Sequence, residues 1–194
     1  MKEALIRSFL AIDLHAPMQA KLEEVVTTLR SKANLPVRWV AGKNIHLTLK
    51  FLGESELDQL RELENAILPR LQTYASFDIR VGGLGAFPVS GHPRVIWVGV
   101  QAPPILEQIA NEVESISVNQ GYERENRRFS PHLTLGRVSQ SANPQQALLI
   151  REMLHKTQVA ELGTIQVDAV TLIQSVLTPA GPIYSPLSVL RFSC

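Results

Sequence analysis

Two short stretches of the chain alternate polar and apolar residues as a half-buried β-strand does. They are identical, His-Leu-Thr-Leu, and occupy residues 46–49 and 132–135. Successive side chains of a strand point to opposite faces, so each histidine shares a face with its threonine and the leucines occupy the other. We therefore expect two strands whose leucines enter the core and whose imidazole and hydroxyl groups face a cleft.

Apolar residues spaced three or four apart predict four amphipathic helices. We expect these helices to begin near residues 17, 55, 103 and 143. Asn143 followed by Pro144 is typical of a helix start. Ser55 with Asp58 resembles a capping box, in which Asp58 stands in for the usual glutamate.

Short apolar or alternating runs predict the strands that accompany the two histidine stretches. They cover residues 8–14, 37–40, 77–81, 94–100, 162–167, 169–177 and 187–192. Glycine and proline are dense over residues 82–93 and 178–186, which predicts a loop or open hairpin in the first segment and a turn-rich connection in the second.

The order of strand, helix, histidine strand, helix and further strands occurs twice along the chain. This repetition predicts an internal duplication, with approximate repeats at 7–83 and 94–192 inside a single two-lobed domain that spans 1–194. We expect an α+β fold with pseudo-twofold symmetry, in which two mainly antiparallel sheets lie side by side with helices outside. The histidines would face a central cleft, a common place for a ligand.

Composition narrows the class of protein and its partners. The chain has 194 residues, 45% apolar and 19% charged, as in ordinary globular proteins, and a net charge of +1. Such a balance argues against a long nucleic-acid track but allows a local basic pocket. The one cysteine is Cys194, which fits a reducing compartment, and Arg7 and Asp13 interrupt the first apolar run. We expect a cytoplasmic monomer that makes no membrane contact.

A pair of histidines suits proton transfer near neutral pH, because an unperturbed imidazole titrates at about 6.5. One such motif on a strand is more often a structural detail, and it is the second copy that favours catalysis. No HExxH motif or cluster of Cys, His and Asp accompanies them, so we predict neither a metal nor another cofactor.

At residues 7–11, 46–53, 129–137 and 170–175 the chain resembles the two-histidine phosphoesterase superfamily. Within it, the chain is similar to the RNA 2′,3′-cyclic phosphodiesterases, also called 2′-5′ RNA ligases. The resemblance implies metal-independent hydrolysis of a terminal 2′,3′-cyclic phosphate to a 2′-phosphate, with reversible 2′-5′ RNA ligation as a further activity. The implied partners are RNA ends, tRNA fragments among them.

The resemblance also implies roles for individual residues. His46 would be the general acid that protonates the leaving 3′ oxygen, and His132 the general base that activates water. Thr48 and Thr134 would donate hydrogen bonds to phosphate oxygens. Arg137 would contact the phosphate, although simple alternation puts it on the leucine face unless a bulge at Gly136 turns it.

Other substrate-binding candidates are weaker. Lys50 has the same strand parity as His46, and a basic loop offers Arg124, Arg127 and Arg128, which could equally be a solvated surface. A base could stack on one of several aromatic residues, most of which the sequence also allows in the core. They are Trp39, Phe51, Phe87, Phe129 and Tyr184.

Two alternatives stay open. The chain could be a phosphodiesterase for a small substrate, such as ADP-ribose cyclic phosphate or 2′-5′ oligoadenylate. It could instead be a nucleotide- or RNA-binding module that has the fold without turnover.

Overall fold

The computed structural model describes residues 5–32, 34–179 and 181–193, and Cys194 lies outside them. Its strands are β1 (Ile6–Ile12), β2 (Val37–Trp39), β3 (Leu47–Ser55), β4 (Phe77–Phe87), β5 (Val95–Gln101), β6 (His132–Val138), β7 (Gly163–Val167), β8 (Ala169–Thr178) and β9 (Gly181–Arg191). Its helices are α1 (Ala16–Lys32), α2 (Leu57–Leu71), α3 (Pro104–Asn119) and α4 (Pro144–His155), with a 3₁₀ turn, η1 (Gly42–Asn44).

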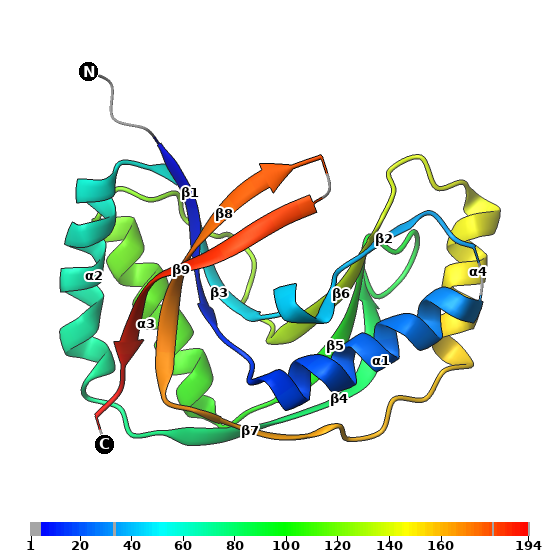
Figure 1. Cartoon of the computed structure of the whole chain (residues 1–194), viewed down its shortest axis with the longest axis horizontal. Coiled ribbons are helices and arrows are strands. Elements are labelled where there is room, and N and C mark those ends of the chain that lie inside the picture. Colours follow the sequence, from blue (N-terminus) through cyan, green and yellow to red (C-terminus); the bar gives the residue numbers. More distant parts are fainter. Residues whose placement is uncertain (1–4, 33, 180, 194) are drawn as a thin grey trace.

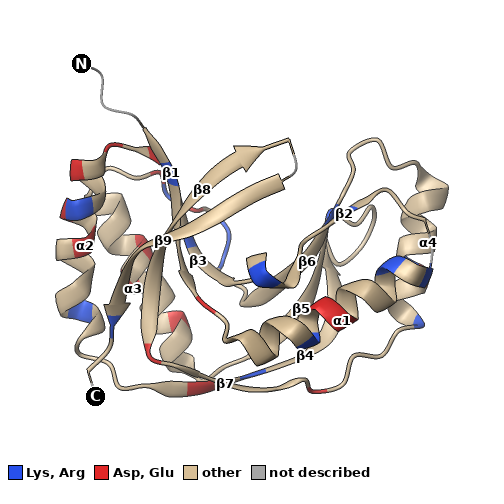
Figure 2. Ribbon diagram, viewed as in Figure 1, with Lys and Arg blue, Asp and Glu red and all other residues tan. Residues whose placement is uncertain are grey.

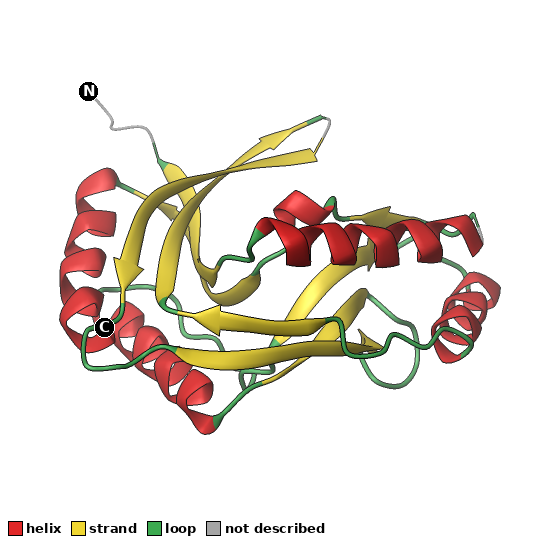
Figure 3. Cartoon of the chain, turned by 60° about the horizontal axis from the view of Figure 1, so that its bottom comes forward, coloured by secondary structure: helices red, strands yellow, loops and turns green. Residues whose placement is uncertain are grey.

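The strands form two antiparallel sheets, one in the order β3-β1-β8-β9 and the other in the order β2-β6-β5-β4-β7. Helices α2 and α3 flank the first sheet, and α1 and α4 lie beside the second (Figure 1). The helices stay on the outside when the molecule is turned (Figure 3). The predicted α+β class, with two antiparallel sheets and outer helices, is confirmed.

The two halves of the chain exchange elements between the sheets. Strand β4, from the first half, pairs with β5, while β8, from the second half, pairs with β1. Helix α1 follows β1 but packs on η1 and β6, and α3 follows β5 but packs on β3. Each lobe therefore draws on both halves, and the limits of the two repeats stay a prediction.

The motif leucines point inward as expected. Leu47, Leu133 and Leu135 are fully buried, and Leu49 packs against the same core. Burial of one leucine side chain stabilises a fold by about 1.5–3 kcal/mol, so these residues fix the orientation of both motif strands.

Both segments rich in glycine and proline lie in β-hairpins. The first is the predicted open hairpin, because β4 and β5 pair antiparallel, and the second is shorter than the predicted turn-rich connection, because β9 begins within it. Strand β4 continues through the glycine-rich stretch to Phe87, and Gly85 lies under Trp97, where a Cβ would come within 2.4 Å of the indole. Strand β9 begins at Gly181 and contains Pro182 and Pro186. Because β9 is the edge of its sheet, prolines without an N–H are tolerated there.

The two capping arrangements predicted for helix starts, at Asn143 and at Ser55, have different outcomes. The side chain of Asn143 accepts a hydrogen bond from the Gln146 N–H at 2.9 Å, as part of a capping box that begins α4. The predicted capping box at Ser55 is wrong, because Ser55 is the buried last residue of β3 and Glu56 precedes α2 without a side-chain cap.

No helix in the described part of the chain is long and apolar enough to cross a membrane.

Candidate active site

The two motif strands carry the same irregularity. In β3, Thr48 lies opposite Ala11 and Lys50 opposite Leu10, so Leu49 is an extra residue with no partner. In β6, Thr134 lies opposite Trp97 and Gly136 opposite Ile96, which leaves Leu135 without one. A bulge of this kind reverses the alternation of side chains beyond it.

The bulge determines which side chains of each strand face the cleft beyond the motif. Beyond it in β6, Arg137 lies opposite Val95, on the same face of the sheet as Thr134. The bulge is at Leu135 and not at Gly136, but it turns the arginine toward the cleft in the way that a contact with phosphate requires. The corresponding residue of β3 is Phe51, which lies opposite Phe9 and is 59% exposed.

The parity argument does not hold for Lys50, because the same bulge turns it to the core side of the sheet. Its ammonium is buried, forms an ion pair with Glu114 of α3 at 2.7 Å, and donates to the Glu123 carbonyl at 2.5 Å. A lysine held in this way ties β3 to α3 and to the loop before β6. Lys50 also belongs to the lining of the cleft, and its contact with a substrate stays a prediction.

A cleft with a volume of about 580 Å³ lies between the two motif strands and the loop that precedes β6. Its lining includes five of the predicted site residues, Thr48, Lys50, Thr134, His132 and Arg137. The aromatic candidates Phe51, Phe87 and Phe129 also line it. His46 is not part of the lining and lies immediately before β3.

His132 is half-buried at the start of β6. Its Nδ1–H donates to the Ser130 carbonyl at 2.7 Å, which leaves Nε2 with a free lone pair when the ring is neutral. Phe87 meets the ring edge-on, with centroids 5.0 Å apart. Burial lowers the pKa of His132; the Ser130 carbonyl opposes this effect, and the charges of Arg137 and Arg127 add to it.

His46 is more enclosed. Phe9 stacks on its ring with centroids 4.5 Å apart, and Tyr184 of β9 meets it edge-on at 5.2 Å. Burial lowers the pKa of His46 to about 4; a hydrogen bond to the Asn44 backbone works in the opposite direction, and the charge of Arg137 lowers the pKa further. Before an anion binds, this imidazole is neutral at pH 7.

Arg137 links the two histidines, because its charge acts on both imidazoles. An anion that neutralised the guanidinium would remove one cause of both lowered pKa values and would itself favour imidazolium. In this arrangement the proton affinity of both histidines depends on the charge of one arginine.

The basic loop before β6 is largely neutralised. Arg127 is paired with Glu125 at 2.9 Å and Arg128 with Glu107 at 3.0 Å, while Arg124 has no acidic partner among the described residues. These ion pairs are exposed, and such pairs contribute little to stability. They nevertheless reduce the positive charge that this loop contributes to the cleft.

The sequence interpretation missed two residues that matter to the site. Phe9 packs on His46, and Arg38 of β2 lies directly opposite Arg137. Phe9 reads as one apolar residue in a buried run. Arg38 stands between Val37 and Trp39, a charged residue between apolar ones, and only the pairing of β2 with β6 gives it a place.

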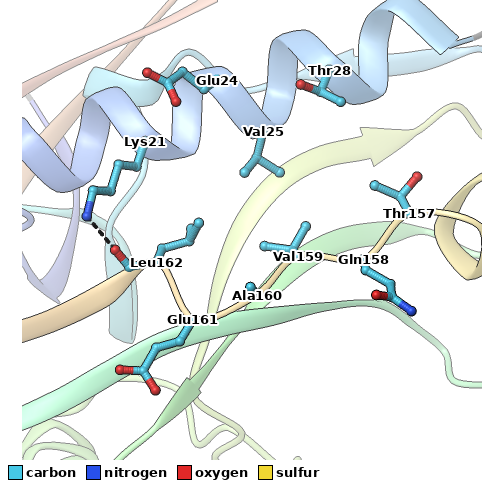
Figure 4. Close-up of a pocket in the computed structure, with 10 residues that line it drawn as sticks. All are labelled: Lys21, Glu24, Val25, Thr28, Thr157, Gln158, Val159, Ala160, Glu161 and Leu162. Atoms are coloured by element: carbon cyan, nitrogen blue, oxygen red, sulfur yellow. Dashed lines mark hydrogen bonds between the residues drawn. The ribbon is translucent and has the colours of Figure 1, made fainter.

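A separate cavity of about 440 Å³ lies between α1 and residues 157–162 (Figure 4). Its lysine, Lys21, already donates to the Leu162 carbonyl at 2.6 Å, and the lining contains no histidine. Across the described residues, no group of three or more His, Cys, Asp or Glu side chains is arranged to hold a metal ion.

Residues 17–178 match the model of a family described as the 2′-5′ RNA ligase superfamily. An RNA 2′,3′-cyclic phosphodiesterase of Methanothermobacter thermautotrophicus is 36% identical over 186 residues, which cover 96% of this chain and 98% of that protein. A protein of the same name from Thermotoga maritima is 32% identical, with 96% of each chain covered.

Solved structures have the same architecture. The crystal structure of TT0787 of Thermus thermophilus superposes with a TM-score of 0.76 at 26% identity and covers 96% of this chain and 97% of that one. The crystal structure of Escherichia coli LigT complexed with 3′-AMP gives a TM-score of 0.75 at 28% identity, covering 98% of this chain and 100% of that one.

Proposed function

This chain belongs to the 2′-5′ RNA ligase superfamily, and on that premise we propose that it hydrolyses the 2′,3′-cyclic phosphate at the end of an RNA, leaving a 2′-phosphate. Relatives that match over nearly their whole length are named for this activity. A related protein has been crystallised with 3′-AMP, a nucleotide whose phosphate is on the 3′ oxygen of the ribose, one of the two oxygens that a 2′,3′-cyclic phosphate bridges. Reversible ligation of RNA ends by the same site belongs to the proposal.

In the proposed mechanism the two imidazoles move the two protons of the reaction. Water attacks phosphorus and gives its proton to Nε2 of His132, whose Nδ1–H is held by the Ser130 carbonyl. The bond from phosphorus to the 3′ oxygen breaks, and that oxygen takes a proton from His46. Each proton transfer of this kind accelerates a reaction by roughly 10²–10⁴-fold.

His46 must carry a proton for this role, although burial holds its pKa at about 4. The substrate would raise the pKa of His46, because its negative phosphate neutralises Arg137 and stabilises an imidazolium beside it. We therefore expect binding and protonation of His46 to be coupled, so that the acid forms only where a phosphate is present.

Charge that develops on the phosphate oxygens needs hydrogen-bond donors in place of a metal. Arg137 offers a guanidinium on the cleft face, and Thr48 and Thr134 offer hydroxyl groups in the cleft lining. Donors fixed in advance at such positions are a large source of rate enhancement in enzymes. Phe51, exposed on the other side of the cleft, offers a surface for the terminal base.

The observation that carries the proposal is the way Arg137 relates to the motif residues. A bulge brings this arginine onto the face that Thr134 occupies, and its charge acts on His46 and His132 alike. A binding module would need the arginine but not two imidazoles whose pKa values respond to it.

The test is an end-group assay on an oligonucleotide that ends in a 2′,3′-cyclic phosphate, run with EDTA. The proposal expects the cyclic end to disappear and a 2′-phosphate to accumulate at an unchanged rate when EDTA is added. A 3′-phosphate product would reverse the assignment of the leaving oxygen. Tight binding without turnover would favour the binding module, and turnover confined to small cyclic phosphates would favour the small-substrate enzyme.

A further inference from the structure

Two arginines stand side by side on the cleft face of the second sheet. Arg38 of the edge strand β2 is directly opposite Arg137 of β6. Side chains at such positions have Cβ atoms about 4.5–5.5 Å apart, and like charges there destabilise the sheet. The neighbours of Arg38 on its own strand, Val37 and Trp39, lie over Gly136 on the other face, so Arg38 itself must point toward the cleft side.

Neither arginine is neutralised by the protein. Within residues 5–32, 34–179 and 181–193, no hydrogen bond or ion pair engages the side chain of Arg38 or Arg137, although Arg127 and Arg128 on the opposite loop are paired with glutamates. Figure 2 shows basic residues where β2 and β6 lie side by side, with acidic residues mostly on the helices and in other strands. An unpaired cation beside a second cation is the arrangement that an anion stabilises.

Tyr184 connects this pair to the histidine site and to a third cation. Its ring meets His46 edge-on, and its hydroxyl lies in the field of Arg137, Arg7 and Arg38. Burial raises the pKa of Tyr184, and these three charges act against that rise. Arg7 lies opposite Glu54 on β3, but no ion pair joins the two among the described residues.

We propose that Arg38, directly opposite Arg137 across the sheet, forms a second phosphate subsite that binds the phosphodiester preceding the terminal nucleotide of the substrate. The inference rests on the proposed function, which places the reacting cyclic phosphate at Arg137. One guanidinium then serves each phosphate, because the two arginines are neighbours across a sheet and the two phosphates are neighbours along a strand. The subsite makes an oligonucleotide end the preferred substrate over a mononucleotide.

The experiment compares two substrates in the full-length protein. One is a mononucleoside 2′,3′-cyclic phosphate, and the other is a dinucleotide with the same terminal nucleotide and cyclic phosphate. For Arg38→Gln we expect kcat/KM to fall by about tenfold or more on the dinucleotide and by no more than about threefold on the mononucleotide. Arg38→Lys keeps the charge and should recover part of the loss.

Salt dependence gives a second measurement of the same contact. On a longer oligonucleotide, the slope of log kcat/KM against log salt should become shallower by about 0.7 in Arg38→Gln, as for one lost contact to a single strand. Arg61→Gln is the matched control. It removes the same charge from the exposed outer helix α2, where Arg61 pairs with Asp58 at 3.0 Å, and should alter neither ratio nor slope.

Equal losses on the two substrates would overturn the subsite, since Arg38 would then act on the reacting phosphate together with Arg137. No loss on either would overturn it as well. If the wild-type protein cleaved neither substrate, the proposed function would fail, and the subsite would be judged by binding alone. Arg38→Gln should still weaken a dinucleotide 2′-phosphate about tenfold more than a mononucleoside 2′-phosphate, and equal weakening would reject it.

Discussion

Strands β3 and β6 start from the same four-residue motif and share a bulge at its last leucine. Up to that point they are interchangeable, each with a histidine and a threonine directed to one side and buried leucines on the other. Beyond it the two strands differ, because β3 continues with Lys50 and Phe51 and β6 with Gly136 and Arg137. The repeated motif supplies one histidine and one threonine to each side of the site, and the residues that follow it differ between the two strands.

The first difference, Lys50 against Gly136, is structural. A Cβ at Gly136 would lie 2.7 Å from Val37 and 2.9 Å from Trp39, so β2 leaves room only for glycine. The corresponding side of β3 faces α3, whose Glu114 receives the Lys50 ammonium. The second difference is chemical, since the cleft gains an exposed ring from Phe51 and a guanidinium from Arg137. Two strands with the same motif thus present different groups to the cleft, and under the proposed function this difference would orient a bound nucleotide.

The histidines differ in a similar way. His46 is enclosed by Phe9 and Tyr184, whereas His132 lines the cleft and touches Phe87. Burial lowers the pKa of both, and His46 reaches about 4. Identical motif residues therefore have different surroundings, and burial is the main cause of the lowered pKa in both.

The largest expected effects come from removing either imidazole. His46→Gln and His132→Ala should each reduce kcat by about 10²–10⁴-fold with RNA ends as substrate, because one proton transfer is lost. Glutamine keeps most of the volume between Phe9 and Tyr184, so a thermal melt should show that the fold survives. His155→Ala, on the exposed end of α4, is the control. Near-wild-type activity in either variant would refute paired acid–base catalysis.

Loss of the guanidinium should rank next. Arg137→Gln removes a donor from the phosphate pocket, which we expect to reduce kcat/KM by about 10²–10³-fold. The same substitution should raise the pKa of both histidines, since the Arg137 charge lowers both. Histidine titrations followed by NMR would measure this rise. If only one imidazole responded, the arginine would not lie between them as the proposal requires.

Local patterns were enough to predict much of the fold. Helical periods located α1 to α4, and alternation in the motif strands correctly assigned their leucines to the core. Alternation alone does not place the bulges, because a register shift depends on the partner strand. A bulge at Gly136 was named as the way to turn Arg137, and the one in β6 lies one residue earlier, whereas the bulge in β3 was not foreseen. A single extra residue at Leu49 turned Lys50 inward, and the one at Leu135 turned Arg137 outward.

Pairing between strands that are distant in the chain was the second feature that the sequence could not predict. The glycine run after Val81 was predicted only as a loop or open hairpin, because the Trp97 ring that lies over Gly85 in the paired strand belongs to β5. Arg38 had no evident role until β2 was paired with β6. The histidines and threonines of the candidate site were thus accessible to sequence reasoning, whereas the neighbours that tune them belong to strands distant in the chain.

Phe51 is the residue of β3 that corresponds to Arg137 of β6, and its substitution tests whether the two strands have different roles. Phe51→Ala should raise KM for RNA ends and leave kcat nearly intact, because stacking of one base contributes about 1–3 kcal/mol. Phe51→Tyr keeps the aromatic face and should retain the wild-type KM. A fall in kcat with unchanged KM would instead give this residue a part in the chemical step.

The threonines should show smaller effects. Thr48→Val and Thr134→Val keep the β-branched shape and remove one hydroxyl each, which we expect to reduce kcat/KM by about tenfold. Similar losses in the two variants would mean that both strands contact the phosphate. If one variant behaved as the wild type, its threonine would serve only the strand.

The mildest test changes no residue. The kcat/KM profile reports the ionisation of the free enzyme, and it is bell-shaped when one imidazole must be protonated and the other neutral. Burial lowers the pKa of His46 to about 4 and also lowers that of His132, so the maximum should lie on the acid side of the ordinary value of 6.5.

The profile of kcat reports the complex with substrate, in which the phosphate charge raises both pKa values, so its maximum should lie at higher pH. A displacement of this sign would mean that the substrate itself protonates the acid, whereas coincident maxima would leave the enclosed His46 without a source for its proton.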